Sequence, residues 1–463
     1  MNRTAAVLLL TCLLFSCTMA PKYTRPEAPV PPDWPEGPAY KKTAGAVAPQ
    51  IKWQDFIQSE PVRKVIEIAL ANNRDLRVSA LNIERARAQY RIQRAQLFPE
   101  VDASGTFSRE RIPGILSQTG QPVTTSLYNV NLGITAWEID FFGRLRSLKD
   151  QALELYLATE QARRSAQTAL IAEVANACLT LAADRENLRL ARSTLVAQEE
   201  TYKVIRRRYE VGASSELDLR QSQTRVETAR VDIARYIGLI AMDENAINLL
   251  AGSQVATGLL PDELDRIAVL QDFSTGLPSE VLLSRPDILQ SENLLKAANA
   301  NIGAARANFF PRISLTTTIG STSDSLSDLF TGPAQTWSFV PQILLPIFDA
   351  GSRWYNLEAA KAQRDIAVAQ YEGAIQTAFR EVADALAQRG TIDDQLRAQQ
   401  DLVFASAESY RLSNLRYSKG IDTYLTVLDS QRSLYASQQA LISLRLARQT
   451  NLVNLYKVLG GGV

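Results

Sequence analysis

Two stretches of equal length constrain this chain more than any other feature. Residues 144–211 contain neither glycine nor proline, and residues 352–419 contain no proline and glycine only at Gly373 and Gly390. Each stretch has 68 residues, which as a helix would extend about 100 Å at 1.5 Å per residue. A compact domain has no room for such a helix. The sequence therefore predicts long paired helices rather than one globular core.

The chain repeats itself, which explains why the two stretches match. Equivalent residues lie 212 positions apart up to about residue 100 and 208 positions apart from Gly143 onward. The pairs are Asp75 and Asp287, Phe98 and Phe310, Gly143 and Gly351, Gly212 and Gly420, and Gly252 and Gly460. A constant offset over so many positions is typical of an internal duplication. The chain is predicted to be two tandem structural repeats.

Both repeats have the same predicted order of elements. Repeat 1 covers 61–252, with an incoming helix at about 61–97, a β-hairpin at about 100–138, a long helix at 144–211 and a return helix at 213–251. Repeat 2 covers 279–463, with an incoming helix at about 279–309, a β-hairpin at about 312–346, a long helix at 352–419 and a return helix at 421–459. Residues 253–278 are predicted to be an equatorial linker. An incoming and a return helix together match one long helix in length, so we expect them to stack end to end beside it.

The hairpins alternate apolar and small polar residues with a period of two. One predicted face holds Tyr128, Val130, Leu132, Ile134 and Ala136, and in the second hairpin Ile313, Leu315, Thr317 and Ile319. Segments 101–110 and 336–345 are the predicted partner strands, and Trp137 and Trp337 fall near strand ends, where membrane interfaces favour aromatic residues. The pattern is typical of a transmembrane barrel wall, although a soluble sandwich alternates in the same way.

Four strands cannot form a closed barrel by themselves. About eight strands are needed for closure, and lipid does not tolerate open sheet edges. A membrane barrel therefore requires several chains that contribute four strands each. Two chains would give a filled interior and three a lumen, so a trimer is favoured if the protein is a channel.

The N-terminus is predicted to be a targeting signal rather than part of the fold. Arg3 precedes a short apolar run that is shorter than the roughly 20 residues of a membrane-spanning helix, so residues 1–16 are predicted to be a secretory signal. The sequence Leu14-Phe15-Ser16-Cys17 resembles a bacterial lipoprotein signal, which implies a covalent lipid on Cys17; the alternative is an ordinary signal peptide. Residues 17–60 are predicted to form an extended arm, because 21–38 contains seven prolines.

The composition disfavours an enzyme. The chain has no histidine, which excludes Ser-His-Asp sites and His-based zinc motifs, although it does not exclude carboxylate pairs or Ser–Lys dyads. It has no phosphate-binding loop, and no metal-binding cluster or cofactor other than the lipid is expected. With 50 Lys and Arg against 49 Asp and Glu, no nucleic-acid partner is expected. Cys178 is predicted to be a small core residue.

Several motifs, together with Cys17 and the Pro-rich arm, resemble one family. They are Asn72-Asn73-Arg74-Asp75-Leu76-Arg77, Arg285-Pro286-Asp287-Ile288, Asn301-Ile302-Gly303-Ala304-Ala305-Arg306, Phe309-Phe310-Pro311, Glu381-Val382-Ala383-Asp384 and Leu459-Gly460-Gly461-Gly462. Over nearly the whole mature chain, the sequence resembles the TolC-like outer membrane factors, in the lipoprotein branch that serves resistance-nodulation-division (RND) efflux pumps.

This resemblance implies a mainly α fold with a membrane β-barrel part. It implies a homotrimer, with four strands per protomer joining a twelve-stranded barrel in the outer membrane and long coiled-coil-like helices forming a periplasmic tunnel. It also implies a passive exit duct for drugs and other small toxic compounds. The implied partners are a periplasmic adaptor (a membrane fusion protein) and an inner-membrane RND transporter.

The two helix turns are the candidate functional sites. Each long helix is predicted to end at a glycine, since Gly212 and Gly420 suit helix ends and Ser or Thr follows to cap the next helix. In the family such tips close the tunnel and receive the adaptor. The residues to which the resemblance assigns the tip turns and adaptor docking are Arg208, Tyr209, Gly212, Tyr417 and Gly420.

The resemblance also implies a gate. Leu425 and Asp429 match positions that narrow the closed pore, where three Asp429 side chains would attract cations; the alternative is that Asp429 is an ordinary solvated carboxylate. Asp218 matches an acidic position of a tip latch, with Arg220 or Arg416 as its expected ion-pair partner.

Two other functions remain as alternatives. One is the outer-membrane channel of a metal-ion pump for copper or silver. The other is a lipid-anchored, non-conducting structural tether, which would explain the helices and Cys17 but not two β-hairpins at matching places.

Overall fold

The structure is a computed structural model that describes residues 18–41, 46–47, 51–118, 120–267, 269, 273–274 and 278–461. The predicted signal 1–16, Cys17 and Gly462 lie outside the described residues. The chain forms two compact units. The sheet unit holds the chain up to Glu27, Asn82–Glu160 and Gln290–Tyr371, and the tip unit holds Ala28–Leu81, Gln161–Leu289 and the chain from Glu372. Each unit takes segments from both repeats, so the units do not coincide with the repeats.

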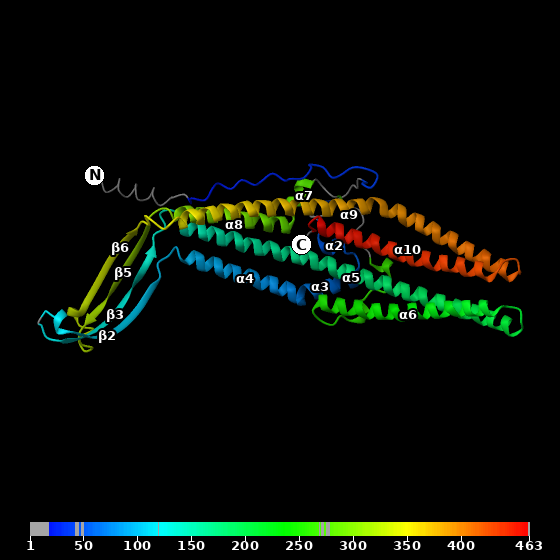
Figure 1. Cartoon of the computed structure of the whole chain (residues 1–463), viewed down its shortest axis with the longest axis horizontal. Helices are drawn as coiled ribbons and strands as arrows, with labels where there is room; N and C mark the ends of the chain where they lie inside the picture. The colour runs from blue at the N-terminus through cyan, green and yellow to red at the C-terminus, as the bar shows by residue number, and fades with distance from the viewer. Residues whose placement is uncertain are drawn as a thin grey trace. The chain divides into compact units, whose positions relative to one another are not determined.

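Long helices dominate the described residues (Figure 1). Helices α5 (Arg144–Glu210) and α9 (Ser352–Ser418) have 67 residues each, and α6 (Glu216–Ala251) and α10 (Tyr424–Val458) follow them as return helices of 36 and 35 residues. A short helix, α2 (Trp53–Phe56), lies within the predicted arm and buries Trp53 and Phe56. These lengths match the predicted long and return helices closely.

The predicted single incoming helices at 61–97 and 279–309 are wrong, because each is broken in two. The observed helices are α3 (Glu60–Asn72), α4 (Arg74–Ala95), α7 (Pro278–Ser284) and α8 (Pro286–Ala307). At the first break, the Asn73 side chain accepts a hydrogen bond from the Leu76 amide at 2.9 Å and starts a new helix. At the second, Arg285 precedes a proline, which disfavours helical geometry in the residue before it. The two breaks fall at equivalent positions of the repeats.

The core of the tip unit follows an apolar stripe along α5. Leu170, Val174, Leu179 and Leu181 are all buried there. Cys178 lies among them with no exposed surface, and burial raises the pKa of its thiol to about 12. Cys178 is therefore a core residue, as predicted, and its thiol stays protonated and unreactive.

The four predicted strands form one antiparallel sheet, which confirms the predicted pair of hairpins. The strands are β2 (Val101–Ile112), β3 (Val123–Glu138), β5 (Arg312–Ser323) and β6 (Gln335–Leu344), in the order β2-β3-β5-β6 (Figure 1). Strands β2 and β6 are its edges. A separate pair, β1 (Ala46–Val47) and β4 (Phe273–Ser274), is parallel.

One face of the large sheet is apolar and exposed. Register places Ala103, Leu132, Ile319 and Trp337 in one row across the four strands. Leu132, Ile319 and Trp337 are 51%, 65% and 78% exposed. The neighbouring row on the opposite face consists of Ser104, Asn131, Gly320 and Thr336. An exposed apolar face suits lipid, and the small polar face suits a water-filled interior.

A β-bulge near the end of β3 changes which residue lies on the apolar face there. Pairing with β5 shifts between Ile134 and Trp137, and Ala136 has a left-handed φ of 52°. The Ala136 amide donates to the Thr316 hydroxyl at 3.1 Å instead of continuing the regular ladder. Because the bulge adds one residue, Trp137 rather than Ala136 joins the apolar face opposite Leu315. The placement of Ala136 on that face was wrong.

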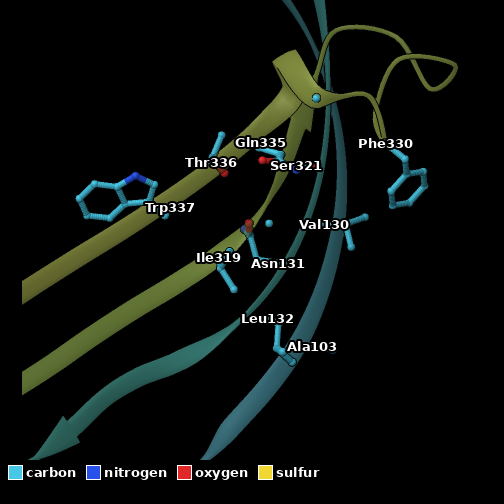
Figure 2. Close-up of a pocket in the computed structure, with 12 residues that line it drawn as sticks. Ala103, Val130, Asn131, Leu132, Ile319, Ser321, Phe330, Gln335, Thr336 and Trp337 are labelled. Atoms are coloured by element: carbon cyan, nitrogen blue, oxygen red, sulfur yellow. The ribbon is translucent and has the colours of Figure 1, made fainter.

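The sheet bounds an open hollow of about 730 Å³ close to the turn between β5 and β6. Phe330 in the turn and Trp337 on β6 are among its lining residues, and Figure 2 shows Trp337 projecting away from the strands. Phe330 is 79% exposed. Two large exposed aromatic rings at one end of the apolar band are typical of a membrane-interface belt.

Candidate functional site

The two helix turns of the tip unit have the same backbone geometry. In the first tip, Gly212 has a φ of 75°, its amide donates to the Tyr209 carbonyl at 2.9 Å, and the Ala213 amide donates to the Arg208 carbonyl at 2.7 Å. In the second tip, Gly420 has a φ of 71° and donates to the Tyr417 carbonyl at 3.0 Å. This is the Schellman helix end, in which the left-handed residue is usually glycine. The predicted glycine turns are therefore present at both positions.

Asp218 serves a local structural role in the first tip. Its amide donates to the Ser215 hydroxyl at 3.0 Å, and its carboxylate accepts from the Ser215 amide at 3.2 Å and the Ser214 hydroxyl at 3.1 Å. These reciprocal bonds form a capping box at the start of α6.

The two arginines expected to pair with Asp218 have other partners within the described chain. Arg220 forms an ion pair with Glu216 at 3.3 Å, one helical turn away. Arg416 forms a two-pronged ion pair with Asp422, at 2.6 and 3.0 Å. The expected pairing of Asp218 with Arg220 or Arg416 is therefore not formed within one protomer.

Asp422 is a tip residue that sequence reasoning missed. Its hydrogen bonds from Arg416 lower the pKa of its carboxyl, so it stays charged over the physiological range. The pair spans the turn at Gly420 and joins the end of α9 to the start of α10. The sequence signal was an aspartate six positions after an arginine, with a helix-ending glycine between them. Only the geometry of the turn shows that the two side chains meet.

An apolar cluster joins the two tips. Ile205 of α5 is buried against Tyr424, Val427 and Leu428 of α10, with Leu219, Tyr410 and Tyr417 packed around them. The Arg208 guanidinium lies over the Tyr417 ring, 5.2 Å from its centre, and the Tyr417 and Tyr424 rings are 5.3 Å apart. The predicted docking residues Arg208 and Tyr417 therefore also link one tip to the other.

Leu425 and Asp429 lie one helical turn apart on the opposite, exposed side of α10. The Leu425 side chain is 55% exposed and that of Asp429 is 57% exposed. Asp429 has one ion-pair partner among the described residues, Arg432 at 3.3 Å. The packed residues Tyr424, Val427 and Leu428 fix this side of α10, so a leucine and a carboxylate are both presented outward from the protomer.

The Pro-rich arm docks on the helices instead of hanging free. In the sheet unit, Arg25 binds the buried Glu292 of α8 at 2.6 Å, and the Asn299 side chain donates to the Pro21 carbonyl at 2.8 Å. Burial would raise the pKa of Glu292, but hydrogen bonds from Arg25 and Lys296 lower it instead. In the tip unit, Trp34 stacks on Phe379 of α9 at 5.2 Å. The arm is therefore part of the packed structure.

Two glycines make room for the arm. A Cβ at Gly303 would lie 2.5 Å from the Ala20 amide nitrogen, and a Cβ at Gly390 would lie 2.0 Å from the Ala39 carbonyl oxygen. Neither distance is compatible with a side chain. Gly390, which looks like a weak point in the sequence of a long helix, is thus explained by the close approach of the arm.

The described residues contain no group of three or more His, Cys, Asp or Glu side chains that could hold a metal ion.

Comparisons with known proteins decide the family. A model described as outer membrane efflux protein matches residues 65–253 and, a second time, residues 277–461. The chain belongs to this family. The double match confirms the two tandem repeats of the outer membrane efflux protein, and the resemblance to TolC-like outer membrane factors is confirmed with it.

Relatives match this chain over almost its whole length. The antibiotic efflux pump outer membrane protein ArpC of Pseudomonas putida is 52% identical over 453 residues, 97% of this chain and 93% of ArpC. Outer membrane protein OprJ of Pseudomonas aeruginosa is 44% identical over 458 residues, 99% of this chain and 95% of OprJ.

Solved structures agree with the fold. A membrane protein from Pseudomonas aeruginosa has a TM-score of 0.91 at 44% identity and covers 96% of this chain and 98% of its own. The open state of the MtrE outer membrane channel of Neisseria gonorrhoeae has a TM-score of 0.87 at 37% identity, with coverage of 96% and 98%. The chain therefore has the fold of TolC-like channels, with a barrel in the bacterial outer membrane and a periplasmic helical tunnel.

The family assignment fixes the broad function. The protein is an outer-membrane channel component of an efflux pump, and its family consists of transport channels rather than enzymes. This favours the channel over the alternative of a non-conducting tether.

Proposed function

We propose that three copies of the chain form the exit duct of a tripartite efflux pump, with a periplasmic adaptor and an inner-membrane RND transporter. The observation that carries this proposal is the four-stranded sheet, whose edge strands β2 and β6 have no further strand beside them among the described residues and whose apolar face is exposed. A sheet with two open edges is unstable in lipid. Three such sheets, joined edge to edge, give a closed twelve-stranded barrel wide enough for a lumen.

The proposed cargo is organic. Relatives at 52% and 47% identity are named as toluene, antibiotic and solvent efflux pump proteins, which supports drugs and other small toxic compounds as the exported class. The duct itself performs no catalysis, and the transporter supplies the energy.

The gate and the anchor complete the proposal. Leu425 and Asp429 of three protomers would form an apolar ring and a carboxylate ring that narrow the closed pore. The tip turns around Arg208, Tyr209, Gly212, Tyr417 and Gly420 would receive the adaptor. Cys17 would carry the lipid that anchors the arm to the outer membrane.

Neighbouring residues on opposite faces of β5 provide the test of the barrel. Ile319→Lys places a charge on the apolar face, which costs up to about 2–4 kcal/mol depending on the depth in the bilayer, whereas Thr318→Lys places it on the polar face. We expect wild type and Thr318→Lys to yield cross-linkable trimers that conduct in planar bilayers, and Ile319→Lys to lose membrane insertion. Equal insertion of both variants would contradict the assigned lipid face.

Cargo is tested in a deletion strain complemented with the wild-type gene. We expect loss of the protein to increase susceptibility to toluene and to several antibiotics, and to leave tolerance of copper and silver salts unchanged. Selective sensitivity to the metal salts would instead support the metal-ion pump.

A further inference from the structure

Two carboxyl groups face each other between the helices of the first hairpin. Asp184 lies on α5 and Asp243 on α6, directly beside the Arg185–Glu244 ion pair that joins the two helices at 2.8 Å, and each carboxyl acts on the pKa of the other. The Asp243 Oδ2 atom is buried and has no donor among the described residues. Both groups are acceptors when ionised, so a hydrogen bond between them requires one shared proton.

The surrounding charges do not neutralise this pair. Arg235 of α6 acts on Asp184 from a distance, and the Asn187 side chain hydrogen-bonds to Asp184. Glu244, the other nearby carboxylate, is bound by Arg185 at 2.8 Å. Glu244 is thus neutralised by Arg185, whereas the Asp184 and Asp243 carboxyls face each other with room for one proton between them.

The second repeat shows what the same positions look like without the acids. At the offset of 208 residues, Asp184 corresponds to Ile392 and Asp243 to Asn451. Ile392 is buried, and the Asn451 amide donates to the Ala385 carbonyl and to the Gln388 side chain, both at 3.0 Å. The second hairpin thus has a neutral link that does not depend on a proton.

We propose that Asp184 and Asp243 form a proton-sharing clasp between α5 and α6, which holds the helices together when one proton bridges the two carboxyls and loosens them when both are ionised. The clasp makes the mobility of the first hairpin depend on pH, while the second hairpin stays indifferent. It is a property of the helix pair and stands apart from whether the chain conducts.

The direction of the effect follows from proton linkage. Burial, followed by the neighbouring Asp184 carboxylate, raises the pKa of Asp243 to about 6, whereas an aspartate released to solvent has a pKa of about 3.9. The closed state therefore holds a proton that the loosened state releases. Closure is favoured at acidic pH, and that advantage is lost as the pH rises through about 6.

Hydrogen–deuterium exchange on the full-length protein in detergent tests the clasp. Between pH 5.0 and 7.5, protection of the amides around Asp184 and Asp243 is expected to fall about three- to tenfold. The amides around Ile392 and Asn451 serve as the internal reference for the chemical pH dependence of exchange. A wild-type protein in which both hairpins change equally would overturn the proposal without any variant.

Two variants and a matched control sharpen the test. Asp243→Asn, which copies the residue of the second repeat, is expected to remove the pH dependence and keep protection at pH 7.5 at its acidic value. Asp184→Asn removes the pair from the other helix and is expected to do the same. Glu227→Gln changes an exposed α6 carboxylate bound to Arg230 and is expected to keep the wild-type pH dependence. Wild-type pH dependence in either aspartate variant would contradict the clasp.

Discussion

The two helical hairpins, α5–α6 and α9–α10, have nearly the same lengths and the same glycine turns, but their charged groups differ. The first hairpin has Asp184 and Asp243 where the second has Ile392 and Asn451. At the tips the difference is reversed, since Asp429 of the second hairpin corresponds to Gln221 of the first. The repeats therefore preserve the backbone that builds a long hairpin, while their polar chemistry has diverged.

The tip arginines show how one substitution redirects a side chain. Arg208 and Arg416 are equivalent, but Arg416 has Asp422 six residues later and Arg208 has Ser214. Arg416 therefore pairs within its own turn, at 2.6 Å. Arg208 has no acid at the equivalent position and lies over Tyr417 of the other hairpin instead.

The arm adds a second asymmetry. Its two glycine seats, Gly303 and Gly390, correspond to Arg91 and Ala182 in the first repeat. In the described residues the arm packs where the second repeat offers these glycines. The two glycines therefore show that the arm can pack closely against the second repeat and not against the equivalent positions of the first.

The largest effect is expected from filling one of these seats. Gly390→Ala would force the arm off α9, and we expect tryptic cleavage at Lys41 to accelerate about tenfold or more because the bound arm is protected. Gly373→Ala, on the same helix with open space around it, is the control and should stabilise the helix by about 0.5–1 kcal/mol. Equal cleavage of both variants would show that the arm does not depend on Gly390.

A smaller effect is expected at the proposed gate. Asp429→Ala removes the carboxylate ring, so we expect the cation-to-anion permeability ratio in planar bilayers to fall about threefold. Gln221→Ala, at the equivalent position of the first tip, should leave the ratio unchanged. If the two variants behave alike, the difference between the tips has no role in ion selection.

Helix capping should also differ between the tips. Ser215→Ala removes the capping box of α6 and is expected to cost about 1 kcal/mol of unfolding free energy. Thr423→Ala, at the equivalent N-cap of α10, should have little effect, because the Thr423 side chain makes no capping hydrogen bond. Denaturant titration of both variants measures the difference, and a larger loss in Thr423→Ala would reverse the assignment.

The smallest effect concerns the contact between the tips. A double-mutant cycle of Arg208→Gln and Tyr417→Leu is expected to give a coupling energy of about 0.5–1 kcal/mol. Arg207, which pairs with Glu210 at 3.4 Å, provides the matched cycle with Tyr417 and should give no coupling. Similar coupling in the two cycles would mean that the stacked geometry contributes nothing specific.

Features set by apolar periodicity and by the residues that end helices and strands were predictable from the sequence. The two long helices, the four strands and the glycine turns each follow from local rules that the final packing does not override. The breaks at Asn73 and Arg285 were also encoded locally, by a capping side chain and by a proline. They were missed because an apolar helical pattern continues on both sides of each break.

Features that depend on distant contacts were not predictable in this way. The bulge at Ala136 arises from pairing with β5, and the seat at Gly390 arises from contact with a segment some 350 residues earlier. Within one protomer, Asp218, Arg220 and Arg416 have other partners than the predicted ones, because several acids lie within reach in sequence. Only the turn geometry selects among them.

The docked arm also sets the order in which the protein can be completed. Arg25 leaves the ribosome early, but its partner Glu292 follows 267 residues later. The arm can bind only after α8 has been made and packed, so ring closure over this long separation comes late in folding. A chain in which α8 has not yet packed cannot dock its arm through Arg25. Docking of the arm therefore reports that α8 is in place.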